Sequence, residues 1–151
     1  QGGSEKWEYK LAWLARLQRY LEERCKPGQP LALCGDFNIA PEARAVHNPT
    51  LSEGSVLFHE DLRAAFTRLC AWGLTDAFRL HHEEGGLFSW WDYRMLAFPK
   101  ITGLRIAHIL LTAPLAARCT STLIDREERK GQQPSDHAPV VVELTDRTFA
   151  A

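Results

Sequence analysis

Two short polar clusters and one aromatic cluster hold the residue types that could do chemistry in this sequence. The first polar cluster is Gly35-Asp36-Phe37-Asn38, which directly follows the apolar run Leu31–Cys34. Open α/β sheets bind ligands at the carboxyl ends of strands, and side chains two residues apart on an extended segment face one side. Asp36 and Asn38 therefore form a candidate site of one carboxylate and one amide. An Asx-type turn that ends the strand explains the same residues equally well.

The second polar cluster is Ser135-Asp136-His137, just before the apolar run Ala138–Leu144. Asp136 offers a carboxylate that suits a metal ion, and His137 offers an imidazole that can accept or donate a proton. The alternative is a turn capped by serine and aspartate, with a histidine at the surface.

Together the two polar clusters supply two carboxylates, an amide and an imidazole, with no serine or cysteine arranged as a nucleophile. That set of groups suits hydrolysis of a phosphate ester by an activated water molecule. A nucleic acid as the substrate does not follow from this chemistry alone.

The aromatic cluster is Phe88-Ser89-Trp90-Trp91-Asp92-Tyr93-Arg94. Alternate aromatic residues in a strand commonly pack in a core or on a sheet face. Adjacent residues of a strand point to opposite faces, so we expect one of Trp90 and Trp91 to be buried and the other to be less buried. An aromatic surface next to Arg94 suits contact with a nucleotide or a sugar.

The elements that must position these clusters follow from the hydrophobic pattern. Apolar residues at helical spacing predict helices over Ser4–Arg24 and His59–Trp72, and the segment Ala40–Ser55 is expected to be a long loop. Five runs are typical of strands: Leu31–Cys34, Leu87–Trp91, Arg105–Leu111, Thr120–Glu127 and Ala138–Leu144. No internal repeat or linker interrupts the pattern, which predicts one α/β domain over residues 1–151.

Composition sets broad limits on the class of protein. The 151 residues, 45% hydrophobic and 25% charged, are typical of one globular domain with a core. A net charge of -1 gives no support for a DNA partner, because non-specific nucleic-acid binders are usually basic. Four widely spaced cysteines without a Cys-x-x-Cys pair argue against a zinc or redox site and favour a reducing cytoplasm.

The chain shows no apolar run of the roughly 18 to 20 residues that span a bilayer, and we expect no membrane partner. Its first residues have no basic-then-apolar pattern, which argues against a signal peptide. Because the sequence begins Gln1-Gly2-Gly3 without a methionine, we expect it to be cut from a longer one.

With these residues in view, the chain resembles the exodeoxyribonuclease III and abasic-site endonuclease group of the endonuclease/exonuclease/phosphatase superfamily, from about Gly2 to Leu144. Gly-Asp-x-Asn and Ser-Asp-His are shared across that superfamily, whereas Trp-Trp-Asp-Tyr-Arg and Gly-Leu-Arg-Ile are similar to its DNA-repair branch. The landmarks are Gly35-Asp36-Phe37-Asn38-Ile39-Ala40-Pro41, Trp72-Gly73-Leu74-Thr75-Asp76-Ala77-Phe78-Arg79, Phe88-Ser89-Trp90-Trp91-Asp92-Tyr93-Arg94, Gly103-Leu104-Arg105-Ile106 and Ser135-Asp136-His137-Ala138-Pro139.

The resemblance implies a DNA repair nuclease that uses Mg²⁺ or Mn²⁺ to cut double-stranded DNA at abasic sites and to trim 3′ ends. By motif position, Asp36 would position or deprotonate the attacking water, and Asn38 would donate a hydrogen bond to a phosphate oxygen. Asp136 would belong to the metal site, and His137 would hold the scissile phosphate or assist proton transfer.

The same resemblance implies how DNA is bound. Trp90 and Leu104 would line the pocket for an extruded abasic sugar, which selects a missing base because no base fits in it and none has to be unstacked. Arg94 would probe the groove of kinked DNA.

Two departures from the family pattern bear on activity. The chain corresponds to the C-terminal half of family members, so the half that supplies further metal ligands is absent, and one carboxylate holds Mg²⁺ weakly. The family has Asp where this chain has Ala107, and that Asp would orient His137. His108 cannot replace it, because its side chain faces the other side of the strand. Ala45, where relatives often carry Asp, is a softer departure. We therefore expect an impaired or inactive nuclease.

The implied fold is half of a four-layer α/β sandwich, with one mixed, mostly antiparallel sheet and helices on its outer face. The inner sheet face would be exposed and apolar, which predicts self-association or a covering N-terminal half. A non-catalytic DNA-binding or assembly module is the rival function, and a phosphatase of small or lipid phosphoesters is a weaker one.

Overall fold

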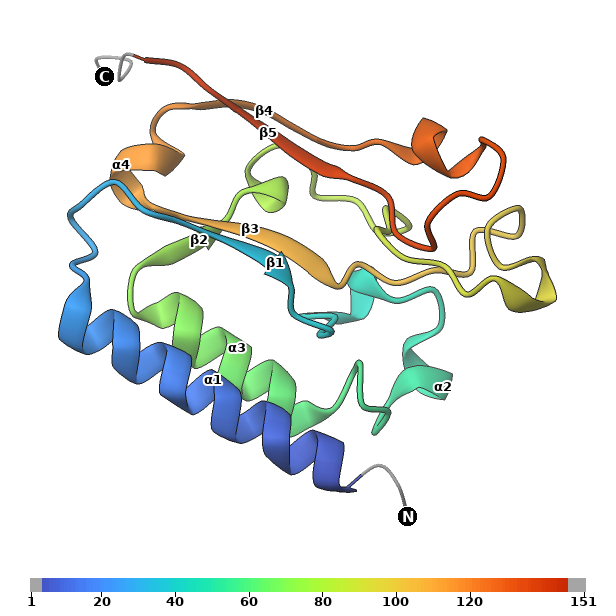
Figure 1. Ribbon diagram of the computed structural model, residues 1–151, viewed down its shortest axis with the longest axis horizontal. Helices are drawn as coiled ribbons and strands as arrows, with labels where there is room; N and C mark the ends of the chain where they lie inside the picture. Colours follow the sequence, from blue (N-terminus) through green and yellow to red (C-terminus); the bar gives the residue numbers. More distant parts are fainter. Residues whose placement is uncertain (1–3, 147–151) are drawn as a thin grey trace.

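A computed structural model describes residues 4–146. Two long helices, α1 (Ser4–Arg24) and α3 (Glu60–Ala71), lie side by side on one side of the strands (Figure 1). Their apolar stripes meet each other and the sheet in the largest core cluster, which includes Leu14, Leu62 and Leu110. The predicted helices are confirmed to within one residue at each end, because period-3.6 patterns over three or more turns are strong signals.

The sheet that these helices cover on one face has the strand order β1-β3-β2, and both of its strand pairs are antiparallel. Its strands are β1 (Ala32–Asp36), β2 (Leu74–Asp76) and β3 (Ala107–Thr112). In the register of β1 with β3, Asp36 lies directly across from Ala107. The short strand β2 was not predicted, because three residues are too few to show a periodicity.

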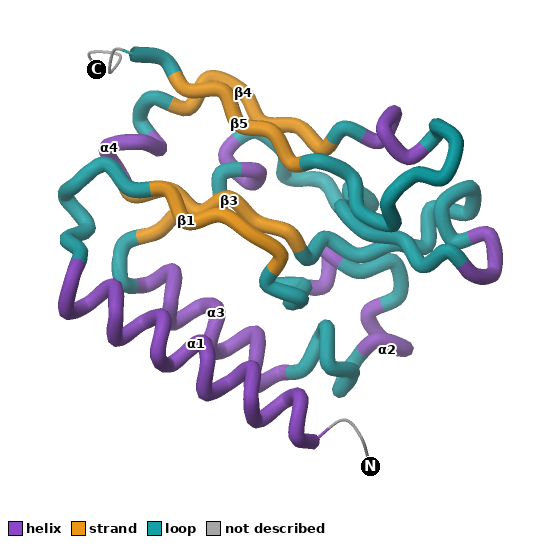
Figure 2. Tube along the Cα trace, viewed as in Figure 1, coloured by secondary structure: helices purple, strands orange, loops and turns teal. Residues whose placement is uncertain are grey.

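A separate antiparallel hairpin consists of β4 (Cys119–Ile124) and β5 (Val140–Leu144). Figure 2 shows this hairpin beyond β1 and β3, on the side away from the two long helices. Strand β4 ends before the predicted Glu127, because Asp125 caps a 3₁₀ turn by accepting a hydrogen bond from the amide of Glu127. The short helix α4 (Ala113–Ala116) connects β3 to the hairpin.

The segment Leu87–Trp91, predicted as a strand, is an irregular extended link between the two sheets. The amides of Ser89 and Trp90 donate to the carbonyl of Leu104, and the amide of Ala138 donates to the carbonyl of Ser89. The Ser89 hydroxyl accepts from the amides of Ile106 and Ala107, so a side chain replaces part of the strand ladder. The expected single sheet is therefore two regular sheets joined by isolated bridges.

The predicted loop Ala40–Ser55 contains a 3₁₀ turn (Ala43–Ala45) and the short helix α2 (Pro49–Ser52), which Asn48 caps with its side chain. The mixture of helices with antiparallel strands confirms the α/β class. Within residues 4–146 no helix is both long and apolar enough to cross a membrane.

Apolar side chains remain exposed on the strands, as expected for a sheet face that lacks a covering layer. They are Ala32 and Cys34 on β1, and Leu123, Val141 and Leu144 on the hairpin. Self-association through this face stays a prediction.

Candidate active site

The Asp36–Asn38 turn lies at the carboxyl end of β1. Oδ1 of Asp36 accepts a hydrogen bond from the Asn38 amide at 2.9 Å, and Asn38 has a φ of 52°, in the left-handed region that Asn tolerates. The alternative reading as an Asx turn is thus right in its geometry. It does not exclude a site, because one carboxylate oxygen holds the turn and the other faces outward.

That second oxygen lies near the Ser135–His137 cluster. Oδ2 of Asp36 is 3.7 Å from Nε2 of His137, and Oδ1 of Asp136 is 3.8 Å from the same nitrogen. All three side chains are about one-third exposed. The structure therefore brings Asp36, Asp136 and His137 together from separate strand ends, at distances too long for direct hydrogen bonds. A ligand or water oxygen could lie between them.

Asp136 has a partner that the sequence did not suggest. Nε1 of Trp90 donates a hydrogen bond to Oδ2 of Asp136 at 3.0 Å, and the amide of Trp91 donates to the Asp136 carbonyl at 3.1 Å. The aromatic cluster thus orients a carboxylate of the polar cluster. The Nε1–H of an indole can only donate a hydrogen bond, so a partly buried Trp90 needs an acceptor. That need is the signal in the sequence that could have suggested a bond to a carboxylate.

Two residues that sequence reasoning missed, Lys10 and His108, also donate hydrogen bonds to backbone carbonyls at the Asn38 turn. Nζ of Lys10 donates to the carbonyls of Asn38 at 2.7 Å and Val56 at 3.2 Å. Burial lowers the pKa of Lys10, and the nearby Asp36 partly offsets that effect by raising it. Nε2 of His108 bonds the carbonyl of Ile39 at 2.7 Å.

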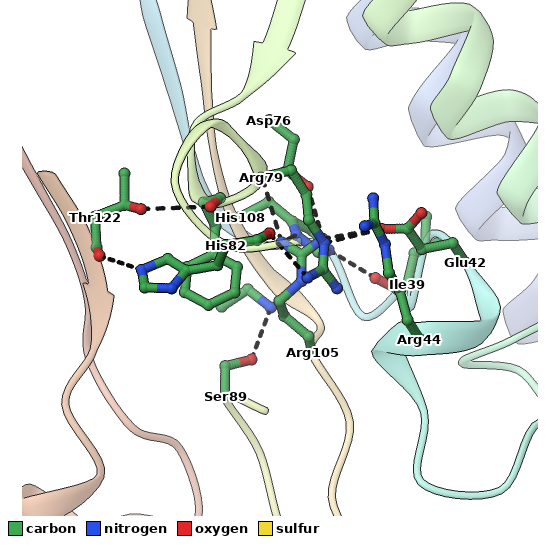
Figure 3. A network of polar contacts seen from close by, with 12 residues as sticks. Ile39, Glu42, Arg44, Asp76, Arg79, His82, Ser89, Arg105, His108 and Thr122 are labelled. Carbon is green, nitrogen blue, oxygen red and sulfur yellow. Dashed lines mark hydrogen bonds and ion pairs between the residues drawn. The ribbon is translucent and has the colours of Figure 1, made fainter. Parts of the chain in front are cut away.

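His108 belongs to a buried network of polar side chains (Figure 3). Arg105 donates to both carboxylate oxygens of Asp76, at 2.7 and 3.2 Å, and its Nη1 lies 3.2 Å from Nδ1 of His108. Burial, followed by the charge of Arg105, lowers the pKa of His108 to about 4. The imidazole is therefore neutral at pH 7, accepting from Arg105 at Nδ1 and donating to Ile39 at Nε2.

Ala107 and His108 point to opposite sides of β3. Ala107 pairs with Asp36 at the candidate site, whereas His108 is fully buried against the rings of Phe37 and Phe66. The expected opposite orientation of these two neighbouring side chains is confirmed. Ala45, the softer departure, is fully buried in its 3₁₀ turn.

The three predicted DNA-contacting residues Trp90, Arg94 and Leu104 line one cavity of about 410 Å³. The same cavity is also lined by His47, Asp92, Met95, Ala97 and Thr102. Trp91 is fully buried and Trp90 only partly, as expected for neighbours on an extended segment.

Arg94 is not free in this arrangement. Its guanidinium donates to both carboxylate oxygens of Asp92, at 2.6 to 3.1 Å, and these bonds lower the pKa of Asp92 to about 2. The next residue, Met95, is 85% exposed and has a φ of 57°, a strained conformation for a long side chain.

The described residues do not form a complete metal centre. Across residues 4–146, no group of three or more His, Cys, Asp or Glu side chains is placed to hold an ion. Asp136 and Asp36 are two oxygen-bearing groups of the kind that Mg²⁺ prefers, but Mg²⁺ needs close to octahedral coordination. Further ligands would have to come from outside the described residues.

Comparison with protein families gives a match to the Endonuclease/Exonuclease/phosphatase family over residues 1–137. Exodeoxyribonuclease III of Haemophilus influenzae is 37% identical over 146 residues, which are 92% of this chain and 55% of that protein. The Bacillus subtilis exodeoxyribonuclease is 31% identical over 91% of this chain and 53% of its own length. The chain thus spans about half the length of the curated relatives it matches.

Solved structures agree with the sequence comparison. An AP endonuclease from Archaeoglobus fulgidus superposes with a TM-score of 0.88 and 37% identity, covering 91% of this chain and 54% of that one. A 3′ phosphatase from Neisseria, bound to a product DNA hairpin, superposes with a TM-score of 0.85 and 36% identity over the same shares.

Proposed function

We propose that this chain, which belongs to the endonuclease/exonuclease/phosphatase family, is part of a DNA repair nuclease that hydrolyses phosphodiester bonds at abasic sites and 3′ ends. Its relatives include exodeoxyribonucleases and an AP endonuclease of similar fold. The observation that carries the proposal is the meeting of Asp36, Asp136 and His137 within 4 Å, next to the cavity lined by Trp90 and Leu104.

Each side chain then has a role that its geometry allows. Asp36 has one carboxylate oxygen fixed by its own turn and one facing His137, so it can position or deprotonate a water molecule between them. His137 is within reach of a phosphate oxygen placed at the same point, and the exposed Asn38 amide can donate to a second phosphate oxygen.

The proposal includes Mg²⁺ or Mn²⁺ as the ion that would stabilise negative charge on the phosphate. Asp136, oriented by Trp90, is the residue of this chain proposed to bind it together with groups outside the described residues. The incomplete ligand set supports no more specific role for the ion within this chain.

We further propose that activity is impaired in this chain. Neither carboxylate near His137 is within hydrogen-bond distance of its Nε2, and Ala107 offers no third one. An unoriented imidazole samples several rotamers, and loss of one acid or base contribution costs about 10²- to 10⁴-fold in rate.

An incision assay on a duplex with a single abasic site, in the presence of Mg²⁺, tests the proposal. We expect little or no cleavage by this chain, and measurable cleavage by a chimaera in which it replaces the matching segment of Haemophilus influenzae exodeoxyribonuclease III. Near-normal turnover by the chain alone would contradict the impairment. A folded chimaera with Ala107→Asp that neither binds nor cuts abasic DNA would contradict the nuclease assignment.

A non-catalytic DNA-binding module is the second candidate function. The cavity with Trp90, Arg94 and Leu104 is present, whereas the orienting carboxylate at position 107 is not. Binding of abasic DNA that EDTA does not change, with no cleavage by the Ala107→Asp chimaera, would favour this function over the nuclease.

A further inference from the structure

Arg129 is a buried cation close to the candidate active site in sequence and in space. It ends the 3₁₀ turn Arg126–Arg129, which follows β4 at the end of the hairpin away from the C-terminus (Figure 1), and it is 6% exposed. Within residues 4–146 it has no ion pair, and its Nε has no hydrogen-bond partner. Because burying an unpaired charge is costly, other contacts must hold this cation in place.

Three aromatic rings supply those contacts. Cζ of Arg129 lies 5.0 Å from the ring centroid of Phe98, 5.3 Å from that of Tyr93 and 5.8 Å from that of Trp91. These distances fall within the ~6 Å over which the face of a ring attracts a cation. Trp91 is fully buried and meets Phe98 edge to face, with 5.1 Å between centroids. The guanidinium is therefore enclosed and oriented by residues of this chain.

One hydrogen bond leads from this cation to the segment that carries the active-site residues. Nη1 of Arg129 donates to the carbonyl of Ser135 at 2.6 Å. The carbonyls directly before and after it accept from the hydroxyl of Tyr93, at 2.7 Å, and from the amide of Trp91, at 3.1 Å. Three successive carbonyls, those of residues Pro134–Asp136, are thus held by Arg129 and by two residues whose rings it contacts.

The same backbone sets the direction of two side chains of the candidate site. The amide of His137 donates to Oγ of Ser135 at 3.1 Å, directly after the carbonyl that Arg129 holds. Nε2 of His137 is 3.7 Å from Asp36 and 3.8 Å from Asp136. A rotation of this backbone would change both distances, since neither is fixed by a direct hydrogen bond.

We infer that Arg129 is a positioning residue of the candidate active site: its guanidinium, held by three rings, fixes the Ser135 carbonyl and thereby the placement of Asp136 and His137 relative to Asp36. This role depends only on contacts among buried and bonded groups of this chain. It rests on the proposed function only for its consequence in catalysis.

Arg126 offers a matched control for the test. Its guanidinium also lies over Phe98, at 4.7 Å, and over Trp91, at 5.6 Å, but within the described part of the chain it donates no hydrogen bond to residues 133–138. Arg129→Met and Arg126→Met each remove a cation from the same rings and keep an apolar stem. Only Arg129→Met also removes the bond to the Ser135 carbonyl.

The first measurement is amide hydrogen exchange of this chain, followed by NMR. The reporters are the amides of His137 and Trp91, which donate to Ser135 and Asp136, and amides of β3 report the opening of the whole fold. Relative to β3, Arg129→Met is expected to speed exchange of both reporters about ten- to 100-fold, the effect of losing one hydrogen bond from a charged donor. Equal acceleration by the Arg126→Met control would overturn the positioning role and leave Arg129 as a packing residue.

A second pair of variants covers the case in which Arg129→Met does not fold, as circular dichroism would reveal. Lysine keeps the charge but not the planar guanidinium, so Arg129→Lys and Arg126→Lys are milder changes. Arg129→Lys is expected to speed exchange at His137 about three- to tenfold more than Arg126→Lys does. Equal rates in this pair would again overturn the role.

The second measurement connects the role to catalysis. In the chimaera with Ala107→Asp, Arg129→Met is expected to lower kcat for abasic-site incision about ten- to 100-fold, because a misplaced group slows the chemical step, and to leave the Kd for abasic DNA in EDTA unchanged. Arg126→Met is expected to leave both near the parent values. A parent chimaera that does not cut would contradict the proposed function, while the exchange rates would still decide the positioning role. A cutting parent with equal kcat in the two methionine variants would overturn the positioning role alone.

Discussion

Two polar clusters lie on opposite sides of strand β3 and use their polar atoms differently. In the buried cluster, Arg105 forms hydrogen bonds with both Asp76 and His108, at 2.7 to 3.2 Å. In the surface cluster, Asp36 and Asp136 stay 3.7 and 3.8 Å from the imidazole of His137. Burying a polar group without a hydrogen-bond partner costs free energy, whereas an exposed polar group is solvated by water and can later bind a ligand. The first cluster therefore stabilises the fold, and the second has partly exposed polar atoms that can still bind a ligand.

The largest expected effect concerns the surface cluster. Ala107→Asp, made in the chimaera, adds a carboxylate across from Asp36 and is expected to orient His137. Abasic-site incision is expected to rise about 10²- to 10⁴-fold, with little change in the Kd for abasic DNA in EDTA. Ala107→Asn is the matched control, since it fills the same volume without the charge. A similar gain from both variants would show that packing, and not orientation of the imidazole, limits the rate.

The next effect concerns the buried cluster. Asp76→Ala leaves the guanidinium of Arg105 buried without its carboxylate, and breaking such a pair costs about 3–5 kcal/mol of unfolding free energy. Urea denaturation of the chain measures this loss. Asp36→Asn, in the surface cluster, is expected to change the same free energy by no more than about 0.5 kcal/mol. Comparable losses of unfolding free energy in Asp76→Ala and Asp36→Asn would show that the two clusters do not differ in their contribution to stability.

The pH dependence of stability separates the clusters further. Because the pKa of His108 is about 4 in the folded chain against 6.5 when unfolded, only the unfolded chain takes up this proton between those values. The free energy of unfolding is therefore expected to fall as the pH drops from 6.5 towards 4, by about 1.4 kcal/mol per pH unit. His108→Gln is expected to remove that slope. An unchanged slope in this variant would assign the titration to another group.

The smallest expected effect concerns the surface ion pair of Asp92 and Arg94, which has the same two-oxygen hydrogen bonding as the buried pair of Asp76 and Arg105. Asp92 holds Arg94 through both carboxylate oxygens, as Asp76 holds Arg105, but the Arg94 side chain is 84% exposed whereas that of Arg105 is buried. Asp92→Asn is expected to release Arg94 and tighten DNA binding about two- to fivefold, with about 0.9 added to the salt slope. Glu127→Gln, which breaks the surface pair with Lys130, is the control. Equal changes in both would point to net charge alone.

The motifs in the sequence predicted Asp36, Asp136 and His137, and the structure places their side chains together although β1 and β5 belong to different sheets. The sequence did not predict the bond from Trp90 to Asp136, or the support of the Asn38 turn by Lys10 and His108. Those contacts join residues 28 to 69 positions apart, and no local pattern encodes which backbone carbonyl a side chain will reach.

For the fold, the long periodic helices were predicted closely and the strands less so. The error at Leu87–Trp91 has a particular cause: the run is extended and apolar, but the Ser89 hydroxyl accepts the amides that a ladder would have paired with backbone. The short strand β2 could not be predicted for another reason: its three residues show no periodicity, and only their pairing with β3 makes them a strand.

The short side chain of Ala107, which begins β3 directly across from Asp36, has a practical consequence for enzymology. Small carboxylates such as formate can diffuse to an imidazole that the protein itself leaves unsupported. Buffer composition then becomes a variable of the assay, and formate is expected to raise turnover of the chimaera with Ala107 while leaving the Ala107→Asp variant unchanged.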